Sequence, residues 1–265
     1  MSDLWGMPSL KRYCLALLLA AVLAVSGSAP LAAQSDDNND PLESMNRKFF
    51  DFDLFLDRIV VKPVARAYVK VVPAPGRHAI RHVLDNMNEP IVFANNVLQG
   101  QFRRAGITTG RFLLNSTFGF GGILDLASHS SLPKQSGDFG QTLYAWGVGP
   151  GPYLFLPVLG PTNPRDAVGF GVDSAADPVG YAFWTAGSLR YINYSRSLTD
   201  NIDQRSQQLD TLDELQKNAI DFYSEVRSLA RQRRDIELRH GEPGPLPKLD
   251  QLDQRQRSAT AGRPQ

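Results

Sequence analysis

The chain has 265 residues, of which 42% are hydrophobic, 21% charged and 9% aromatic, and its formal net charge is +1 at pH 7. This is the composition of a globular protein, and the length allows one large domain or two small ones with a buried core. A nearly neutral chain gives no indication of a nucleic-acid partner, because such proteins carry a strongly basic surface.

Residues 1–33 are predicted to be a secretory signal peptide. Lys11 and Arg12 precede an apolar run over residues 14–25, and small residues follow. A basic region, a short apolar region and a small-residue cleavage site are typical of such signals. A membrane anchor would need roughly 20 apolar residues, and Ser, Gly and Pro interrupt this run too early. We therefore expect an exported protein with a flexible N-terminus over residues 34–39.

The only cysteine, Cys14, lies inside the predicted signal peptide. The exported protein would then have no thiol, which excludes a disulfide, a thiolate metal site and a cysteine nucleophile. Loss of Lys11, Arg12 and Asp3 with the signal would also reduce the formal charge from +1 to zero. We expect the exported fold to be held by its core alone.

Helices are predicted between residues 40 and 117, where apolar residues recur at spacings of three and four. The first starts after Asp40, which we expect to cap it together with Glu43, and it runs through Ile59. Pro63 is expected to restart the chain. The later helices are expected over residues 64–72, 77–98 and 102–117, with an interruption at Asn88-Glu89-Pro90.

A stretch without any charged residue lies between Phe139 and Pro164 and is rich in Gly, Pro and aromatic residues. Residues 140–146 can form a turn or two of helix. The apolar run 153–156 is flanked by two prolines, which predicts a hairpin or an irregular loop packed on something apolar. The stretch is too broken for a transmembrane helix and too apolar for an ordinary surface loop.

The remaining elements are also predicted to be helical. Asn163 starts a helix that leads into residues 167–176, an aromatic region covers 179–202, and a long amphipathic helix is expected over 209–240. Residues 242–265 are polar and predicted to be disordered. The sequence has no internal repeat and no strand pattern of useful length. We predict a mainly α fold, a single domain of amphipathic helices over residues 40–241.

Several short motifs look catalytic but lack the partners that catalysis needs. Asp138-Phe139-Gly140 follows no kinase catalytic loop, so a helix cap is the simpler interpretation. Gly119-x-Gly121-Gly122 does not fit the dinucleotide fingerprint. His78 and His82 are four apart, but no metalloprotease Glu lies between them, and the chain has no Gly-x-Ser-x-Gly elbow. We predict no catalytic residue, no metal site, no cofactor and no enzymatic activity.

The apolar material itself allows two interpretations. Helices with broad apolar faces usually build a buried core. The same faces can lie in a membrane interface with their apolar side in the acyl layer, and an irregular apolar segment is tolerated there if it lines a cavity. Export, several aromatic faces and the uncharged stretch together favour a membrane-associated lipid-handling protein, while core packing stays open.

Many ordered motifs are similar to those of the MlaA/VacJ family. They are Asp40-Pro41-Leu42-Glu43, Met45-Asn46-Arg47, Phe49-Phe50, Leu56-Asp57, Pro63-Val64-Ala65, Asn88-Glu89-Pro90, Leu98-Gln99-Gly100, Arg111-Phe112, Asn115-Ser116-Thr117, Gly121-Gly122-Ile123-Leu124-Asp125-Leu126-Ala127, Asp138-Phe139-Gly140-Gln141-Thr142-Leu143, Trp146-Gly147-Val148, Gly151-Pro152-Tyr153, Leu156-Pro157, Gly160-Pro161 and Arg165-Asp166. The resemblance covers residues 40–239, nearly the whole exported chain.

The resemblance implies a ring-like helical protein with a central passage, located in the periplasmic leaflet of the outer membrane. It implies that the protein removes phospholipid from the outer leaflet and passes it to a soluble periplasmic carrier, which maintains lipid asymmetry. An outer-membrane porin trimer and, indirectly, an inner-membrane ABC transporter are the further partners implied. The alternative is a porin-associated structural scaffold that moves no lipid.

We expect the uncharged stretch to supply the lipid passage, with core packing as the alternative for each residue. The expected lining or gating residues are Phe139, Leu143, Trp146, Tyr153, Leu154, Phe155 and Leu156. Glycines are expected to serve as bends or hinges. These are Gly119, Gly121, Gly122, Gly147, Gly149 and Gly151.

One feature departs from the family pattern. Family members are typically lipoproteins with a cysteine directly after the signal, whereas Cys14 begins the apolar region and does not form a lipobox. We therefore expect a protein that is not lipidated and is held by its helices and the porin, or a start codon assigned at the wrong position. Several buried helical faces can replace one acyl chain, because a single chain gives only marginal membrane binding.

Overall fold

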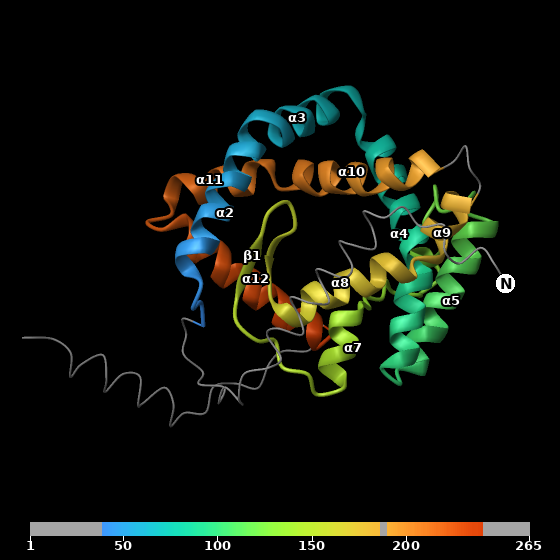
Figure 1. The fold of residues 1–265 in the computed structure, drawn as a ribbon. Coiled ribbons are helices and arrows are strands. Elements are labelled where there is room, and N and C mark those ends of the chain that lie inside the picture. Colours follow the sequence, from blue (N-terminus) through green and yellow to red (C-terminus); the bar gives the residue numbers. More distant parts are fainter. Residues whose placement is uncertain (1–38, 186–189, 241–265) are drawn as a thin grey trace, which may run out of the picture. The chain divides into compact units, whose positions relative to one another are not determined.

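The computed structural model describes residues 39–185 and 190–240, and they are mostly helical, which confirms the predicted mainly α class (Figure 1). The predicted signal peptide, most of the predicted flexible N-terminus and the predicted disordered tail lie outside the described residues. Contacts separate a large unit, which ends at Arg227, from a segment that starts at Ser228. The expected ring around a central passage stays a prediction.

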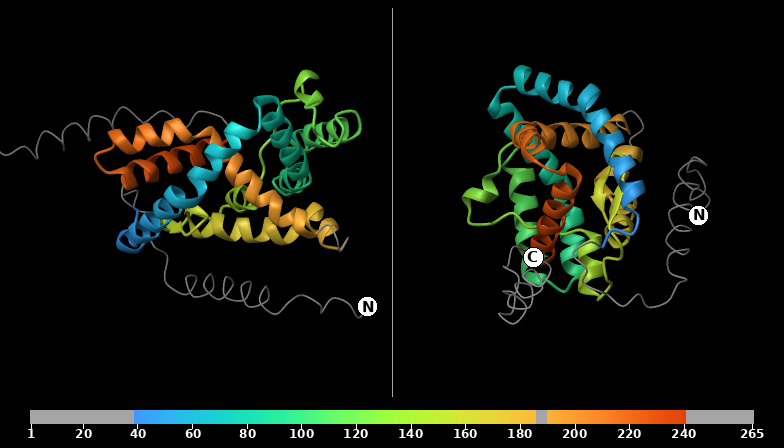
Figure 2. Two further views of the ribbon diagram at one scale, coloured as in Figure 1. Left: turned by 90° about the horizontal axis from the view of Figure 1, so that it is seen from above. Right: turned by 90° about the vertical axis from the view of Figure 1, so that its left-hand side faces the viewer.

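The first helical run is continuous from Glu43 to Val71. It consists of α2 (Glu43–Leu56), the π-helical turn η1 (Asp57–Val61) and α3 (Lys62–Val71), which Figure 2 shows from two further directions. Pro63 therefore does not restart the chain as predicted. In η1 the Lys62 N–H donates to the carbonyl of Asp57, five residues back. The wider turn accommodates a proline whose ring would crowd a regular helix.

The predicted cap of the first helix is wrong. Leu42 occupies the N-cap position and makes no side-chain cap bond. Asp40 is instead buried, where its carboxylate accepts hydrogen bonds from Asn46 Nδ2 at 2.7 Å, from Arg227 at 2.9 Å and from the hydroxyl of Tyr223. Asp40 therefore joins α2 to residues that lie more than 180 positions later in the chain.

The predicted interruption at Asn88-Glu89-Pro90 is also wrong, because α4 runs unbroken over Ala74–Leu98. Pro90 removes one helical hydrogen bond, but buried side chains anchor the helix on both sides of it. Asn86 donates to Ser116 Oγ at 2.9 Å, and Asn95 donates to Asp173 at 2.8 Å. Tertiary hydrogen bonds thus outweigh the local preference of proline.

The elements predicted in the middle of the chain are confirmed, and one further short helix, α6 (Leu126–His129), was not predicted. Helix α5 (Phe102–Thr117) lies beside α4 in all three views (Figures 1 and 2), and the short helices α6 and α7 (Phe139–Ala145) follow. The apolar run forms an antiparallel hairpin of β1 (Leu154–Leu156) and β2 (Gly160–Thr162), in which Phe155 pairs with Pro161. The hairpin interpretation is confirmed.

The last third contains five helices among the described residues. These are α8 (Pro164–Ala176), α9 (Pro178–Thr185), α10 (Arg190–Gln207), α11 (Leu209–Asn218) and α12 (Phe222–Leu238). The single helix predicted over 209–240 is therefore wrong. The break falls before Asp221, whose carboxylate accepts from the backbone and hydroxyl of Ser224 and from Arg47. Capping at this residue starts α12 anew.

The core is unusual because, among the residues whose burial the structure describes, the largest fully buried side chains are all polar. They are Arg111, Asn46, Asn96, Thr108, Thr142 and Asp203. The buried aromatic cluster is small and consists of Phe50, Tyr153, Phe155 and Tyr223. Many large apolar side chains are exposed instead. They include Phe52, Phe55, Ile59, Val71, Phe93, Phe102, Leu113, Phe118, Phe120 and Tyr181. Compared with the usual partition of side chains in water, polar groups are thus enriched in the buried set and large apolar groups in the exposed set.

A close backbone contact between α7 and α8 gives a first test. A Cβ on Gly169 would lie 2.3 Å from the backbone nitrogen of Gly140, whereas a Cβ on Gly171 would meet nothing within 4 Å. We expect Gly169→Ala to lower the free energy of unfolding by about 1–3 kcal/mol through overpacking. The matched control Gly171→Ala should be neutral or raise it by about 0.5–1 kcal/mol. Denaturant titration measures both, and equal effects would refute the contact.

Candidate functional site

The four hairpin residues predicted to line a passage lie on two faces of the hairpin. Tyr153 and Phe155 are buried, and the ring of Phe155 meets that of Phe50 edge-on at 5.4 Å. Leu154 and Leu156 are half-buried and alternate with Phe155 along the strand. Two of the four residues therefore belong to the aromatic cluster. The role of all four in a passage stays a prediction.

The three predicted passage residues near α7 form a second group. Phe139 and Trp146 stack edge-on with ring centroids 5.9 Å apart, and Leu143 is half-buried. Trp146 is 57% exposed, and its indole N–H donates to the carbonyl of Leu98 at 3.2 Å. This group rests on the end of α4 rather than on the hairpin, so the structure does not gather the seven residues into one cluster.

The glycines predicted to act as bends differ in whether their position could accept a side chain. Gly121, Gly122, Gly147 and Gly151 have positive φ, and a Cβ on Gly119 would lie 2.3 Å from the carbonyl oxygen of Leu124. A side chain would be strained at each of these positions. Gly149 has open space around it and no positive φ. Whether any of these residues acts as a hinge stays a prediction.

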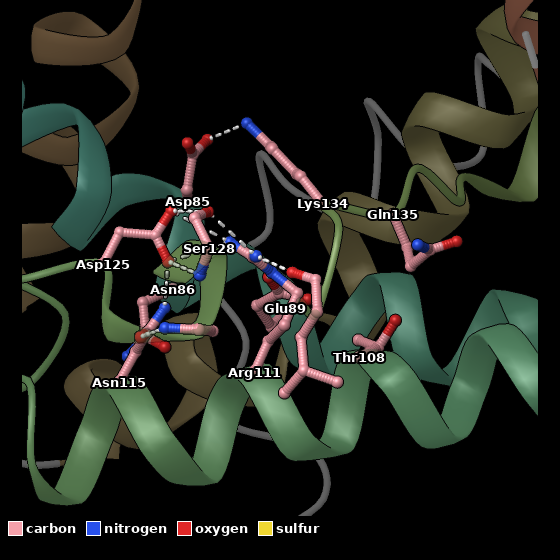
Figure 3. A network of polar contacts seen from close by, with 12 residues as sticks. Asp85, Asn86, Glu89, Thr108, Arg111, Asn115, Asp125, Ser128, Lys134 and Gln135 are labelled. Atoms are coloured by element: carbon pink, nitrogen blue, oxygen red, sulfur yellow. Dashed lines mark hydrogen bonds and ion pairs between the residues drawn. The ribbon is translucent and has the colours of Figure 1, made fainter. Parts of the chain in front are cut away.

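A buried arginine is the most connected side chain near these glycines (Figure 3). Arg111 is 2% exposed, and its Nε lies 3.0 Å from Glu89 of α4. Its terminal nitrogens donate to Asp125 at 3.2 Å and to the carbonyl of Leu132 at 2.6 Å. A buried guanidinium needs such a complete set of acceptors, because an unpaired buried charge is very costly.

The same network fixes a loop of residues 118–124, which we call the apolar loop. Asn115 donates to Asp125 at 3.0 Å and accepts from the backbone of Ala127, while Asn86 donates to the carbonyl of Gly121 at 3.3 Å. These polar contacts hold the two ends and the middle of the loop. Its large side chains point outward, with Phe118 71%, Phe120 74%, Ile123 48% and Leu124 48% exposed.

The two carboxylates around Arg111 differ in their electrostatics. Burial opposes ionisation of Asp125, but hydrogen bonds from Ser128 and Asn115 and the charge of Arg111 together hold its pKa well below the ordinary value of 3.8. Burial raises the pKa of Glu89, against the lowering effect of its hydrogen bond to Arg111. Asp125 is therefore the carboxylate that stabilises the fold through its charge.

A groove of about 420 Å³ lies between α4 and α10, outside all seven predicted passage residues. The side chains that line it are Ala79, Ile80, Val83, Leu84, Met87, Ile123, Ser195, Arg196 and Thr199. This site was not predicted from the sequence. The only available signal was the apolar spacing on α4, which equally predicts ordinary core packing.

Two motifs that resemble enzyme motifs are seen in the structure, one at Asp138 and one at His78 and His82. Asp138 caps α7 by accepting from the backbone of Gln141, as the simpler interpretation predicted. The rings of His78 and His82 are 6.4 Å apart. Within residues 39–185 and 190–240, no group of three or more His, Cys, Asp or Glu residues could hold a metal ion. In the same residues, no helix has both the length and the apolar character to cross a membrane.

Comparison with known proteins identifies the family of the chain. The family model of the MlaA lipoprotein matches residues 38–237. The chain belongs to the MlaA lipoprotein family. The family resemblance seen in the sequence motifs is thereby confirmed.

Relatives that carry the name "intermembrane phospholipid transport system lipoprotein MlaA" include those of Haemophilus influenzae and Escherichia coli K12. That of Haemophilus influenzae is 32% identical, with 87% of this chain and 92% of the relative covered, and that of Escherichia coli K12 is 33% identical, with 87% and 90% covered. A solved structure described as the "Structural basis for maintenance of bacterial outer membrane lipid asymmetry" matches with a TM-score of 0.66 and 35% identity, covering 75% of this chain and 98% of that chain.

These relatives are named lipoproteins, which gives no support to the expectation that this chain carries no lipid. Cys14, on which this expectation rests, lies outside the described residues.

The low pKa of Asp125 predicts a pH-dependent mutant effect. A carboxylate with a lowered folded-state pKa adds stability above its unfolded value of 3.8, and this stability is lost as the pH falls toward the folded-state pKa. We expect Asp125→Asn to lower the free energy of unfolding by about 1–3 kcal/mol at pH 7. The difference from wild type should shrink below pH 3.8. Denaturant titrations across this range measure it.

The control is Asp51→Asn on the exposed side of α2, which should have little effect at any pH. A difference for Asp125→Asn that stays constant from pH 7 to pH 3 would contradict the assigned pKa.

Proposed function

We propose that this protein lies in the periplasmic leaflet of the bacterial outer membrane and removes phospholipid from the outer leaflet. The observation that carries the proposal is the unusual partition of side chains, with many polar groups buried and many large apolar groups exposed. The family supports it, since its named relatives are phospholipid transport lipoproteins and the matching structure concerns outer-membrane lipid asymmetry.

Exposed apolar side chains on this scale suit contact with acyl chains. In water they would form large apolar patches of the kind that mark interaction or membrane surfaces. Helix α3 and the apolar loop show the pattern, with Val71 77% and Phe120 74% exposed. We propose that these helices lie within one leaflet, with their exposed apolar side chains among the acyl chains.

Transfer itself is proposed to need a passage for one phospholipid at a time, enclosed by a ring of helices. Leu154 and Leu156 are its proposed lining, because they are half-buried and alternate with the buried Phe155. The lipid would then pass to a soluble periplasmic carrier. A porin trimer would hold the protein in the membrane, and an inner-membrane ABC transporter would be an indirect partner. No covalent reaction is required for such a transfer.

The proposal is tested in cells by deleting the gene and quantifying outer-leaflet phospholipid with a membrane-impermeant amine label. We expect surface-exposed phospholipid to rise and to return to the wild-type level when the full chain is restored. An unchanged level would contradict lipid removal and favour the porin-associated scaffold.

Substitutions in the hairpin separate a passage role from core packing. We expect Leu154→Asp to abolish complementation in this assay while the protein accumulates normally, because a charge would oppose acyl chains at a half-buried position. Phe155→Asp should instead reduce the folded protein, since Phe155 is 4% exposed and packs on Phe50.

The volume-conserving control Leu154→Met should complement fully. Full complementation by a normally folded Leu154→Asp variant would rule out the assigned passage residue.

A further inference from the structure

Helix α4 presents an apolar stripe to the groove. Ala79, Ile80, Val83, Leu84 and Met87 recur at the spacing that one helix normally uses to pack against another. Across the groove, α10 contributes Ser195, Arg196 and Thr199. These three residues offer hydroxyl groups and one charge, and the α4 stripe lines a space of about 420 Å³.

The charges at the groove are already neutralised by neighbouring carboxylates. Arg196 lies 2.6 Å from Asp177, and the two side chains are only 15% and 17% exposed. Arg81, one residue after Ile80 on α4, lies 2.8 Å from the buried Asp203 of α10. Because both cations have acidic partners, the groove is better suited to an uncharged chain than to an anion.

The groove continues into the apolar loop. Ile123 belongs both to the groove lining and to the loop, where it is 48% exposed. Phe120 and Leu124, on either side of it in the sequence, are also exposed. Through Ile123, the groove therefore adjoins the loop that we propose to contact acyl chains.

We propose that the groove between α4 and α10 binds one acyl chain of a phospholipid, separately from the hairpin and α7 residues of the passage. The volume lies within the range of pockets for small ligands. A helix from another protein, about 10 Å across, would need far more room. This inference rests on the proposed membrane location and lipid transport, and it adds a holding site for lipid before or after the passage.

Photolabelling tests the proposal on the full chain reconstituted in phospholipid vesicles. The probe is a phospholipid with a diazirine in one acyl chain, and mass spectrometry identifies the labelled peptides. We expect label on residues 79–87 and 195–199, in addition to the apolar loop. Unlabelled phospholipid should reduce this label, and a free fatty acid should reduce it less.

Two alanine-to-tryptophan variants on the same helix provide the matched comparison. Ala79→Trp fills the groove, whereas Ala94→Trp adds the same side chain at an exposed position of α4. We expect Ala79→Trp to lose most of the label on 79–87 and 195–199 while the apolar loop stays labelled. Ala94→Trp should be labelled like wild type. Circular dichroism and thermal unfolding confirm that both variants are folded.

Each contrary outcome has a defined meaning. Absent label on 79–87 and 195–199 in wild type, or unchanged label in folded Ala79→Trp, overturns the groove proposal. Equal competition by free fatty acid overturns the assignment to a phospholipid. The cell assay separates this from the proposed function, because wild type that lowers outer-leaflet phospholipid but shows no groove label refutes the groove alone.

Discussion

The ion pairs of Arg111 are the constraint on which the arrangement of α4, α5, the apolar loop and α6 depends. A buried guanidinium between α4 and α5 requires Glu89, Asp125 and the carbonyl of Leu132 to stay in place. The ion pair with Glu89 anchors α4 directly before its proline, in addition to the hydrogen bonds of Asn86 and Asn95, and Asp125 caps the start of α6. The network also explains how the apolar loop can turn its aromatic side chains outward, because polar side chains and backbone rather than an apolar core hold the loop.

Two further polar junctions follow the same principle. Asp40 gathers Asn46, Tyr223 and Arg227, while Asp203 receives hydrogen bonds from Tyr68 and Arg81 and so joins three helices. When buried hydrogen bonds connect the helices, their apolar faces are left to contact the surroundings. In an acyl layer such polar contacts are the ones that must be satisfied internally. The apolar exterior would then be stabilised by lipid instead of by water-excluding packing.

The sequence predicted what depends on local pattern. Helix α5 follows its apolar spacing from residue 102 to 117, and the two prolines around 153–156 indicated a hairpin or an irregular loop, of which the hairpin is observed. The failures lie where a distant partner decides. Arg47 and Asp221, 174 residues apart, mark the break before α12, and the groove arises only when α4 and α10 meet. The Arg111 motif was recognised as a family feature, but spacing alone could not show that its charges are paired and buried.

The proposed contact of the exposed apolar side chains with lipid is tested most directly by measuring where the apolar loop lies. In a Cys14→Ser background, one cysteine is introduced at Phe120 and labelled with a nitroxide in vesicles. It is compared with the same label at Glu214, on the exposed polar side of α11. The collision rates of each label with dissolved oxygen and with a water-soluble nickel complex report its surroundings. The account predicts that the label at position 120 is accessible to oxygen and inaccessible to nickel, and that the label at position 214 shows the opposite. Nickel access at position 120 equal to that at position 214 would contradict it.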